Sequence, residues 1–145
     1  DGIRDLVRSR GLGDVYKRQV LGIGINGHIG LNEPGSSFDS RTRIVKLDEQ
    51  TINRNFERFG KRAGLSLDDM PKYAVAAGIE TILEAKNIML LACGIEKSEI
   101  LNRALNGAPS ISLPASALQA VKNKLTLISD KAATGRIGDL KAEEL

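Results

Sequence analysis

Residues 87–93 read Asn-Ile-Met-Leu-Leu-Ala-Cys, a continuous apolar run that is typical of a buried strand. Shorter strand patterns occupy 20–24, 43–47, 73–77 and 124–129, and helical patterns occupy 48–59, 78–85, 96–106 and 114–121. This alternation of strands and helices predicts an α/β fold, with a Rossmann-like parallel sheet flanked by helices. Asp48 is expected to cap the first of these helices, and the chain from Asp130 onward is expected to be a frayed tail.

The first nineteen residues are expected to lie outside this fold. Residues 14–19 back-translate to GAT GTG TAT AAG AGA CAG, which resembles the end of a transposon adapter used in sequencing libraries. We therefore interpret residues 1–19 as translated adapter and residues 20–145 as part of one domain. The strand at 20–24 then lacks its upstream half, so the fold is expected to be truncated at its N-terminal half.

Composition argues against several classes of protein. A chain of 145 residues with 41% hydrophobic content can form one domain, and only 3% of its residues are aromatic. Residues 1–19 hold five basic and three acidic side chains, which accounts for +2 of the net charge of +3. A nucleic-acid partner is therefore not expected.

No apolar run approaches the roughly 20 residues of a membrane span, so no membrane partner and a cytoplasmic location are expected. The single cysteine, Cys93, is expected to be a buried strand residue.

The sole histidine, His28, lies in a glycine-rich loop that follows the strand pattern at 20–24. Histidine suits proton transfer near neutral pH, and such loops face the crevice at the end of an α/β sheet. Glu33 could hold the second ring nitrogen, and Asn26 could add an uncharged amide contact. A dinucleotide site is not expected, because a loop containing His28 and Pro34 stands where the fingerprint requires a helix.

The loop resembles a known family signature. The string Gly24-Ile25-Asn26-Gly27-His28-Ile29-Gly30-Leu31-Asn32-Glu33-Pro34-Gly35-Ser36-Ser37-Phe38, followed by Ser40-Arg41-Thr42-Arg43, is similar to the signature loop of the glucosamine-6-phosphate deaminases. Later blocks agree in order: Pro71-Lys72-Tyr73-Ala74, Gly78-x-x-Thr81, Gly94-x-x-Lys97 and Ser116-Ala117-Leu118-Gln119. The resemblance implies isomerisation and deamination of glucosamine 6-phosphate to fructose 6-phosphate and ammonia, without a metal or organic cofactor.

The same resemblance assigns roles to individual residues. It implies that His28 is the acid/base that opens the sugar ring, with Glu33 and Asn26 as its relay. Many family members have aspartate at the position of Asn26, so the relay here has one ionisable group fewer. Lys97 matches a family phosphate ligand, and Gly27 is expected to contact the substrate.

The family's phosphate-binding arginine is displaced in this sequence. The family block reads Asn-x-Arg-Phe-Phe, whereas this chain reads Asn55-Phe56-Glu57-Arg58-Phe59, with the arginine one residue later. On an α-helix one residue is a rotation of about 100°. Arg58 is the expected phosphate ligand, and Arg54 is the alternative.

The resemblance also implies what the chain lacks. The family's carboxylate base and its phosphate-binding loop belong to the N-terminal half, so this polypeptide is expected to be inactive alone. Its parent would bind a small-molecule sugar phosphate and could form a homo-oligomer, as family members commonly do.

Ser36 and Arg43 match effector ligands of allosteric members, but Val45 replaces a lysine, so effector control is not expected. A 6-phosphogluconolactonase-like hydrolase, a galactosamine 6-phosphate enzyme and a non-catalytic sugar-phosphate sensor remain alternatives.

Overall fold

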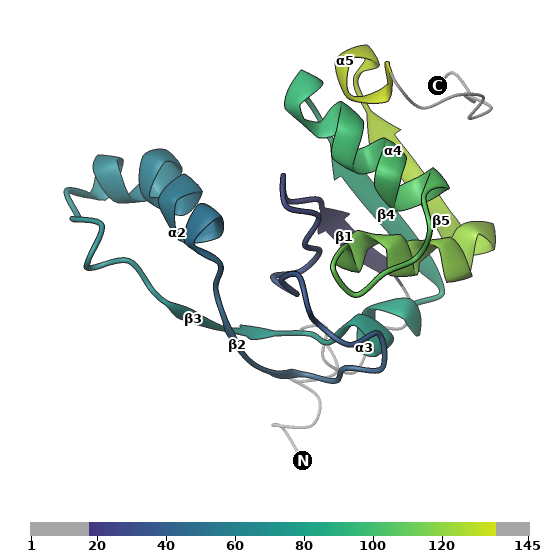
Figure 1. Cartoon of the computed structure of the whole chain (residues 1–145), viewed down its shortest axis with the longest axis horizontal. Coiled ribbons are helices and arrows are strands. Elements are labelled where there is room, and N and C mark those ends of the chain that lie inside the picture. The colour runs from purple at the N-terminus through teal and green to yellow at the C-terminus, as the bar shows by residue number, and fades with distance from the viewer. Residues whose placement is uncertain (1–17, 136–145) are drawn as a thin grey trace, which may run out of the picture.

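A three-stranded parallel sheet forms the centre of the computed structural model, which describes residues 18–135 (Figure 1). The strand order is β1-β4-β5. The strands are β1 Arg18–Gly22, β4 Asn87–Ala92 and β5 Leu125–Ser129. The register places Leu21 beside Leu90 and Leu90 beside Leu127. The predicted parallel sheet is therefore confirmed, and of the segment interpreted as adapter only Arg18 and Gln19 lie within the described residues.

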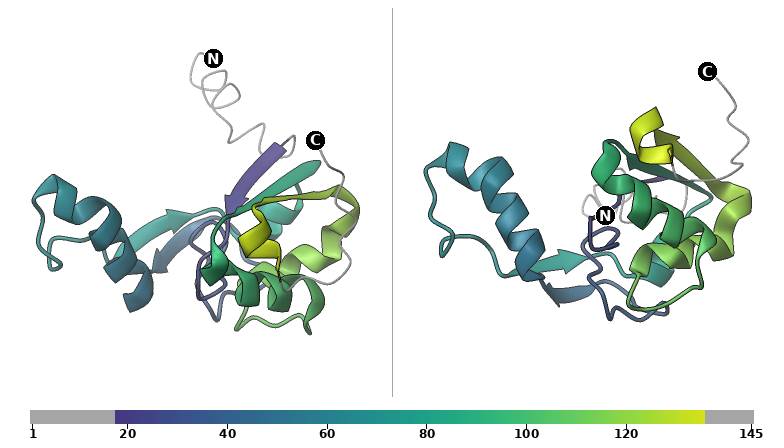
Figure 2. Two further views of the ribbon diagram at one scale, coloured as in Figure 1. Left: turned by 90° about the horizontal axis from the view of Figure 1, so that it is seen from above. Right: turned by 45° about the horizontal axis from the view of Figure 1, so that its top comes forward.

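Helices cover one face of this sheet (Figure 2). Their buried apolar side chains pack with Leu21, Ile88 and Leu90 in one core. The predicted apolar face of α4 is buried and consists of Ile100, Leu101, Ala104 and Leu105. These helices are α3 Ile79–Leu83, η3 Ile95–Lys97, α4 Ser98–Asn106, η4 Pro114–Lys124 and α5 Lys131–Thr134.

The other face of the sheet is open in the described chain. Side chains alternate between the two faces of a strand, so the neighbours of the buried residues point to the opposite side. Val20, Leu91 and Ile128 are 58%, 41% and 39% exposed there. Parallel sheets are normally covered on both faces. The described residues therefore supply the covering helices of one face only.

An arm formed by residues 43–76 extends away from the sheet (Figures 1 and 2). It contains β2 Arg43–Lys46, α2 Glu49–Asn55, a π-helical turn η1 Phe56–Gly60, a 3₁₀ turn η2 Lys61–Ala63 and β3 Tyr73–Ala76. Asp48 caps α2, as predicted, by accepting a hydrogen bond from the backbone N–H of Gln50 at 2.8 Å.

The two strands of the arm do not join the parallel sheet. They pair with each other as an antiparallel ribbon. Strands are present where 43–47 and 73–77 predicted them, but the alternation at 73–93 wrongly indicated that 73–77 belongs to the parallel sheet. Ile44 and Val75 are paired across the ribbon and exposed, whereas Val45 and Ala76 are buried. An antiparallel ribbon can have one face buried and the other exposed, whereas a central strand of a parallel sheet is buried on both faces.

Two further predictions fail at element ends. Cys93 is exposed, because β4 ends at Ala92 and the alternation that buries Ile88, Leu90 and Ala92 turns the next residue outward. The predicted frayed tail is wrong for residues 131–134, which form the short helix α5, since the Asp130 side chain accepts from the Ala133 N–H at 2.8 Å. The part of this prediction at 136–145 lies outside the described residues. Within residues 18–135, no helix is both long and apolar enough to cross a bilayer.

Candidate active site

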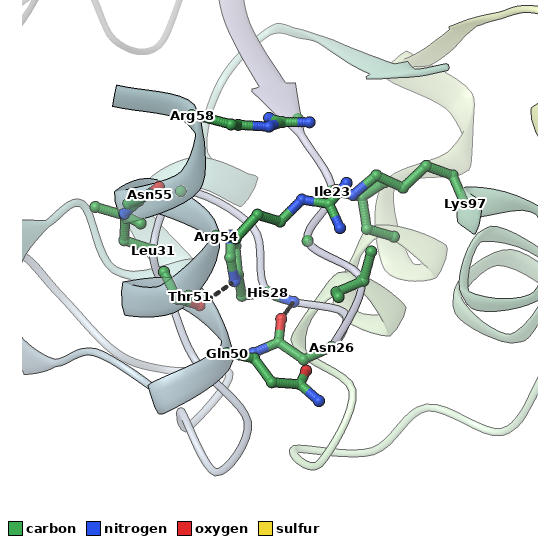
Figure 3. A pocket seen from close by; sticks show the side chains of 14 residues that line it. Ile23, Asn26, His28, Leu31, Gln50, Thr51, Arg54, Asn55, Arg58 and Lys97 are labelled. Carbon is green, nitrogen blue, oxygen red and sulfur yellow. Dashed lines mark hydrogen bonds between the residues drawn. The ribbon is translucent and has the colours of Figure 1, made fainter. Parts of the chain in front are cut away.

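A pocket of about 310 Å³ lies between the arm and the carboxyl end of β1 (Figure 3). Ligands of α/β sheets bind at the carboxyl ends of parallel strands. One wall comes from α2 and η1 of the arm, and the other comes from the loop after β1 and from the start of the helix after β4. The lining residues are Gly22, Ile23, Gly24, Ile25, Asn26, His28, Gly30, Leu31, Gln50, Thr51, Arg54, Asn55, Arg58 and Lys97.

The imidazole of His28 is held through one of its two nitrogens. Nδ1 lies 3.3 Å from Oε2 of Glu33 and 3.3 Å from Oγ1 of Thr51. An ionised carboxylate only accepts hydrogen bonds, so Nδ1 carries the proton in the neutral ring. Nε2 is then the nitrogen with a free lone pair. This tautomer is the one that a general base facing the pocket requires.

Glu33 and Asn26 complete the cluster around the imidazole. Asn26 Nδ2 donates to Glu33 Oε2 at 2.7 Å, and Asn26 Oδ1 accepts from the backbone N–H of His28 at 3.2 Å. Burial of Glu33 acts to raise the pKa of its carboxyl, but hydrogen bonds from His28, Thr51 and Asn26 outweigh burial and hold that pKa at about 2. The sequence-predicted trio is therefore brought together, with Glu33 ionised at neutral pH.

Two glycines shape the loop that carries this cluster. A Cβ on Gly24 would lie 2.5 Å from Nδ1 of His28 and 2.7 Å from Oδ1 of Asn26, so the ring packs directly on this backbone. Gly27 has φ +85°, its N–H donates to the Gly24 carbonyl at 3.0 Å, and it is buried outside the pocket lining. The amide of Gly27 already closes the turn, and the substrate contact expected at Gly27 stays a prediction.

Three cations converge on the pocket from opposite walls (Figure 3). Lys97 is buried, and its Nζ donates to the Ile23 carbonyl at 2.6 Å. Burial lowers the pKa of Lys97, and the positive charge of Arg54 lowers it further. Arg54 and Arg58 line the facing wall. The predicted ligand Arg58, its alternative Arg54 and Lys97 thus share one site.

The turn that carries Arg58 is π-helical. Residues 56–60 form η1, and a π-helical turn accommodates one residue more than an α-helical turn. Arg58 stands one residue later than the arginine of the family block, and on a regular helix this shift would rotate its side chain. In the π-helical turn Arg58 still lines the pocket. Thr51 was not among the predicted site residues, although its i, i+3 spacing from Arg54 places both side chains on one face of α2.

The residues that match an effector site contact one another. Arg43 donates to Ser36 Oγ at 2.9 Å and to Asn32 Oδ1 at 2.8 Å. Val45, which stands where allosteric members have lysine, is buried in the core of the arm. The guanidinium of Arg43 therefore already has two side-chain partners within the loop.

Comparison with known proteins agrees with the loop signature. No family model matches the chain. A deaminase of Oceanobacillus iheyensis, named glucosamine-6-phosphate deaminase, is 50% identical over 115 residues, which cover 79% of this chain and 44% of that protein. The chain is a homologue of the glucosamine-6-phosphate deaminases. Glucosamine-6-phosphate deaminase 2 of Bacillus subtilis is 46% identical over 134 residues, 92% of this chain and 51% of the relative.

Solved structures of deaminases agree with the fold. A monomeric glucosamine-6-phosphate deaminase of the NagB superfamily superimposes with a TM-score of 0.76 at 45% identity, over 91% of this chain and 51% of that structure. A 6-phosphogluconolactonase from Trypanosoma cruzi superimposes with a TM-score of 0.62 at 22% identity, a likeness of fold alone. The chain spans about half the length of the deaminases that it matches.

Proposed function

We propose that the complete protein converts glucosamine 6-phosphate and water to fructose 6-phosphate and ammonia. The supporting observation is that one pocket holds an oriented imidazole and a group of three cations, with His28 and Lys97 on one wall and Arg54 and Arg58 on the other. The first arrangement suits proton transfer, and the second suits a phosphate ester. The names and the identity of the homologous deaminases support the same assignment.

In this proposal His28 opens the sugar ring. Its free Nε2 accepts the proton of the C1 hydroxyl, and the imidazolium then gives a proton to the ring oxygen. Glu33 stabilises the imidazolium, because its carboxylate is ionised and lies 3.3 Å from Nδ1. Asn26 holds that carboxylate in place through its 2.7 Å hydrogen bond. The proton balance is closed, since the imidazole ends the step as it began.

The later steps need a group from the other half of the domain. A carboxylate base moves the proton from C2 to C1 through an enolamine, water adds at C2, and ammonia leaves. Lys97 and Arg58 hold the phosphate during these steps. Family resemblance places the carboxylate base and the phosphate loop outside this chain, so we propose that the 145-residue polypeptide does not turn over alone.

Ammonia release from the complete protein tests the assignment. The expected result is turnover of glucosamine 6-phosphate that a His28→Ala variant loses, with galactosamine 6-phosphate as the competing substrate. Turnover by the 145-residue chain well above its His28→Ala variant would contradict the proposed inactivity. Hydrolysis of 6-phosphogluconolactone, or sugar-phosphate binding without ammonia release by the complete protein, would overturn the deaminase assignment.

We also propose that residues 1–19 derive from sequencing adapter. Reassembly of the source reads tests this origin. Continuous genomic coverage across the codon for Val20 would show that the segment belongs to the gene.

A further inference from the structure

An ion pair joins the arm to the helix after β4 beside the pocket. Nη2 of Arg54, on the arm, lies 3.2 Å from Oε1 of Glu96, which is in η3 after β4. The two side chains are 31% and 48% exposed. Arg54 lines the pocket and Glu96 does not, so the carboxylate occupies the guanidinium without filling the pocket.

The arrangement around Glu96 is unbalanced in charge. Arg54, Arg58 and Lys97 all line the pocket. Burial lowers the pKa of Lys97 and both arginines lower it further, whereas the charge of Glu96 opposes this shift. One carboxylate cannot neutralise three cations, so an anion of higher charge in the interior would be attracted by all three, while the ion pair of Glu96 is with Arg54.

We propose that Glu96 competes with the ligand for Arg54, and that a phosphate ester binds by displacing the Glu96 carboxylate from the guanidinium. This inference rests on the proposed sugar-phosphate site and adds Arg54 as a second arginine ligand whose availability Glu96 controls. A half-exposed ion pair contributes little to stability, so its rupture is a small cost. A phosphate dianion offers more acceptor oxygens to the guanidinium fork than one carboxylate oxygen does.

The exchange gives the site a charge threshold. A monoanion must compete with a tethered carboxylate of equal charge, whereas a dianion has the advantage of its second charge. Displaced Glu96 can turn to solvent, because about half of its side chain already faces water. Glu96 therefore acts as a positioning residue that selects dianionic phosphate esters and weakens their affinity.

Binding of inorganic phosphate to the 145-residue chain, followed by amide NMR titration, tests this exchange without catalysis. Glu96→Gln removes the competing charge, and the expected result is a dissociation constant lower by about 3- to 10-fold, with a steeper dependence on salt. Glu84→Gln is the matched control, because it breaks the ion pair of Glu84 with Arg41 elsewhere on the chain and should leave the constant unchanged.

The double variant Arg54→Gln/Glu96→Gln identifies the route of the effect. It should bind phosphate as Arg54→Gln does, because no guanidinium remains for Glu96 to occupy. An unchanged constant in Glu96→Gln, or a gain that persists in the double variant, would overturn the exchange. If the complete protein is a deaminase but Glu96→Gln does not bind phosphate more tightly, this inference alone is refuted. If Glu96→Gln binds phosphate more tightly but the complete protein is not a deaminase, the proposed function alone is refuted.

Discussion

Substitution of Gly24 by alanine should displace the imidazole of His28 without changing its chemistry. The new Cβ would lie 2.5 Å from Nδ1 of His28, whereas ordinary contact begins at 3.4 Å, so the ring must retreat by about 1 Å. Nδ1 is already 3.3 Å from Glu33, and the retreat breaks this charge-assisted hydrogen bond. Loss of such a bond beside a buried carboxylate lowers the free energy of unfolding by about 2–3 kcal/mol.

Two measurements on the chain check this expectation. Urea unfolding should show the loss of stability, and ¹⁵N NMR of the imidazole should show that the Nδ1–H tautomer no longer dominates. His28 is the sole histidine, so its signals need no separation from others. Gly22→Ala is the matched control, since its Cβ would meet nothing within 4 Å. Equal urea midpoints for the two variants, with the tautomer retained in Gly24→Ala, would refute the argument.

Two further predictions concern charge and packing. The pKa of Glu33 is lowered from 4.5 to about 2, so the stability it contributes is present above pH 4.5 and lost as pH falls through about 2. The difference between these pKa values corresponds to about 3 kcal/mol, and urea titrations of wild type and Glu33→Gln should converge by this amount on acidification; parallel curves would contradict it. Leu90→Ala should cost about 3 kcal/mol because Leu90 is fully buried, whereas its strand neighbour Leu91→Ala should cost less than about 1 kcal/mol. Equal losses measured by thermal unfolding would show that the wrong sheet face has been taken as the core.

Local patterns predicted the elements well, because each depends on neighbouring residues. The spacing of Ile100, Leu101, Ala104 and Leu105 predicted the buried face of α4. The apolar run at 87–93 predicted the strand β4, but not the exposure of Leu91 and Cys93. Strand partners depend on distant residues, and alternation at 43–47 cannot name the strand that it pairs with. The exposure of Ile44 opposite Val75 is the consequence that sequence analysis overlooked.

The site was predicted in its first wall and only partly in its second. His28, Glu33 and Asn26 lie within eight residues of one another, so a loop can bring them together by itself. Thr51 reaches His28, and Arg54 reaches Glu96 of η3, only through the position of the arm, and no local pattern encodes that position. The π-helical turn at Arg58 likewise depends on packing around residues 56–60, so the sequence names Arg58 as a candidate without showing how its side chain reaches the pocket.

The pocket is divided between the arm and the loops of the parallel sheet, which affects how substitutions far from the ligand can change function. Cohesion of the arm rests on a small cluster, with Val45, Leu47 and Ala76 as its buried members. A substitution there leaves every polar group of the pocket chemically intact, yet it shifts Thr51, Arg54 and Arg58 together relative to His28 and Lys97. Substitutions at these buried aliphatic positions of the arm can therefore change ligand affinity as much as a substitution of a residue that contacts the ligand.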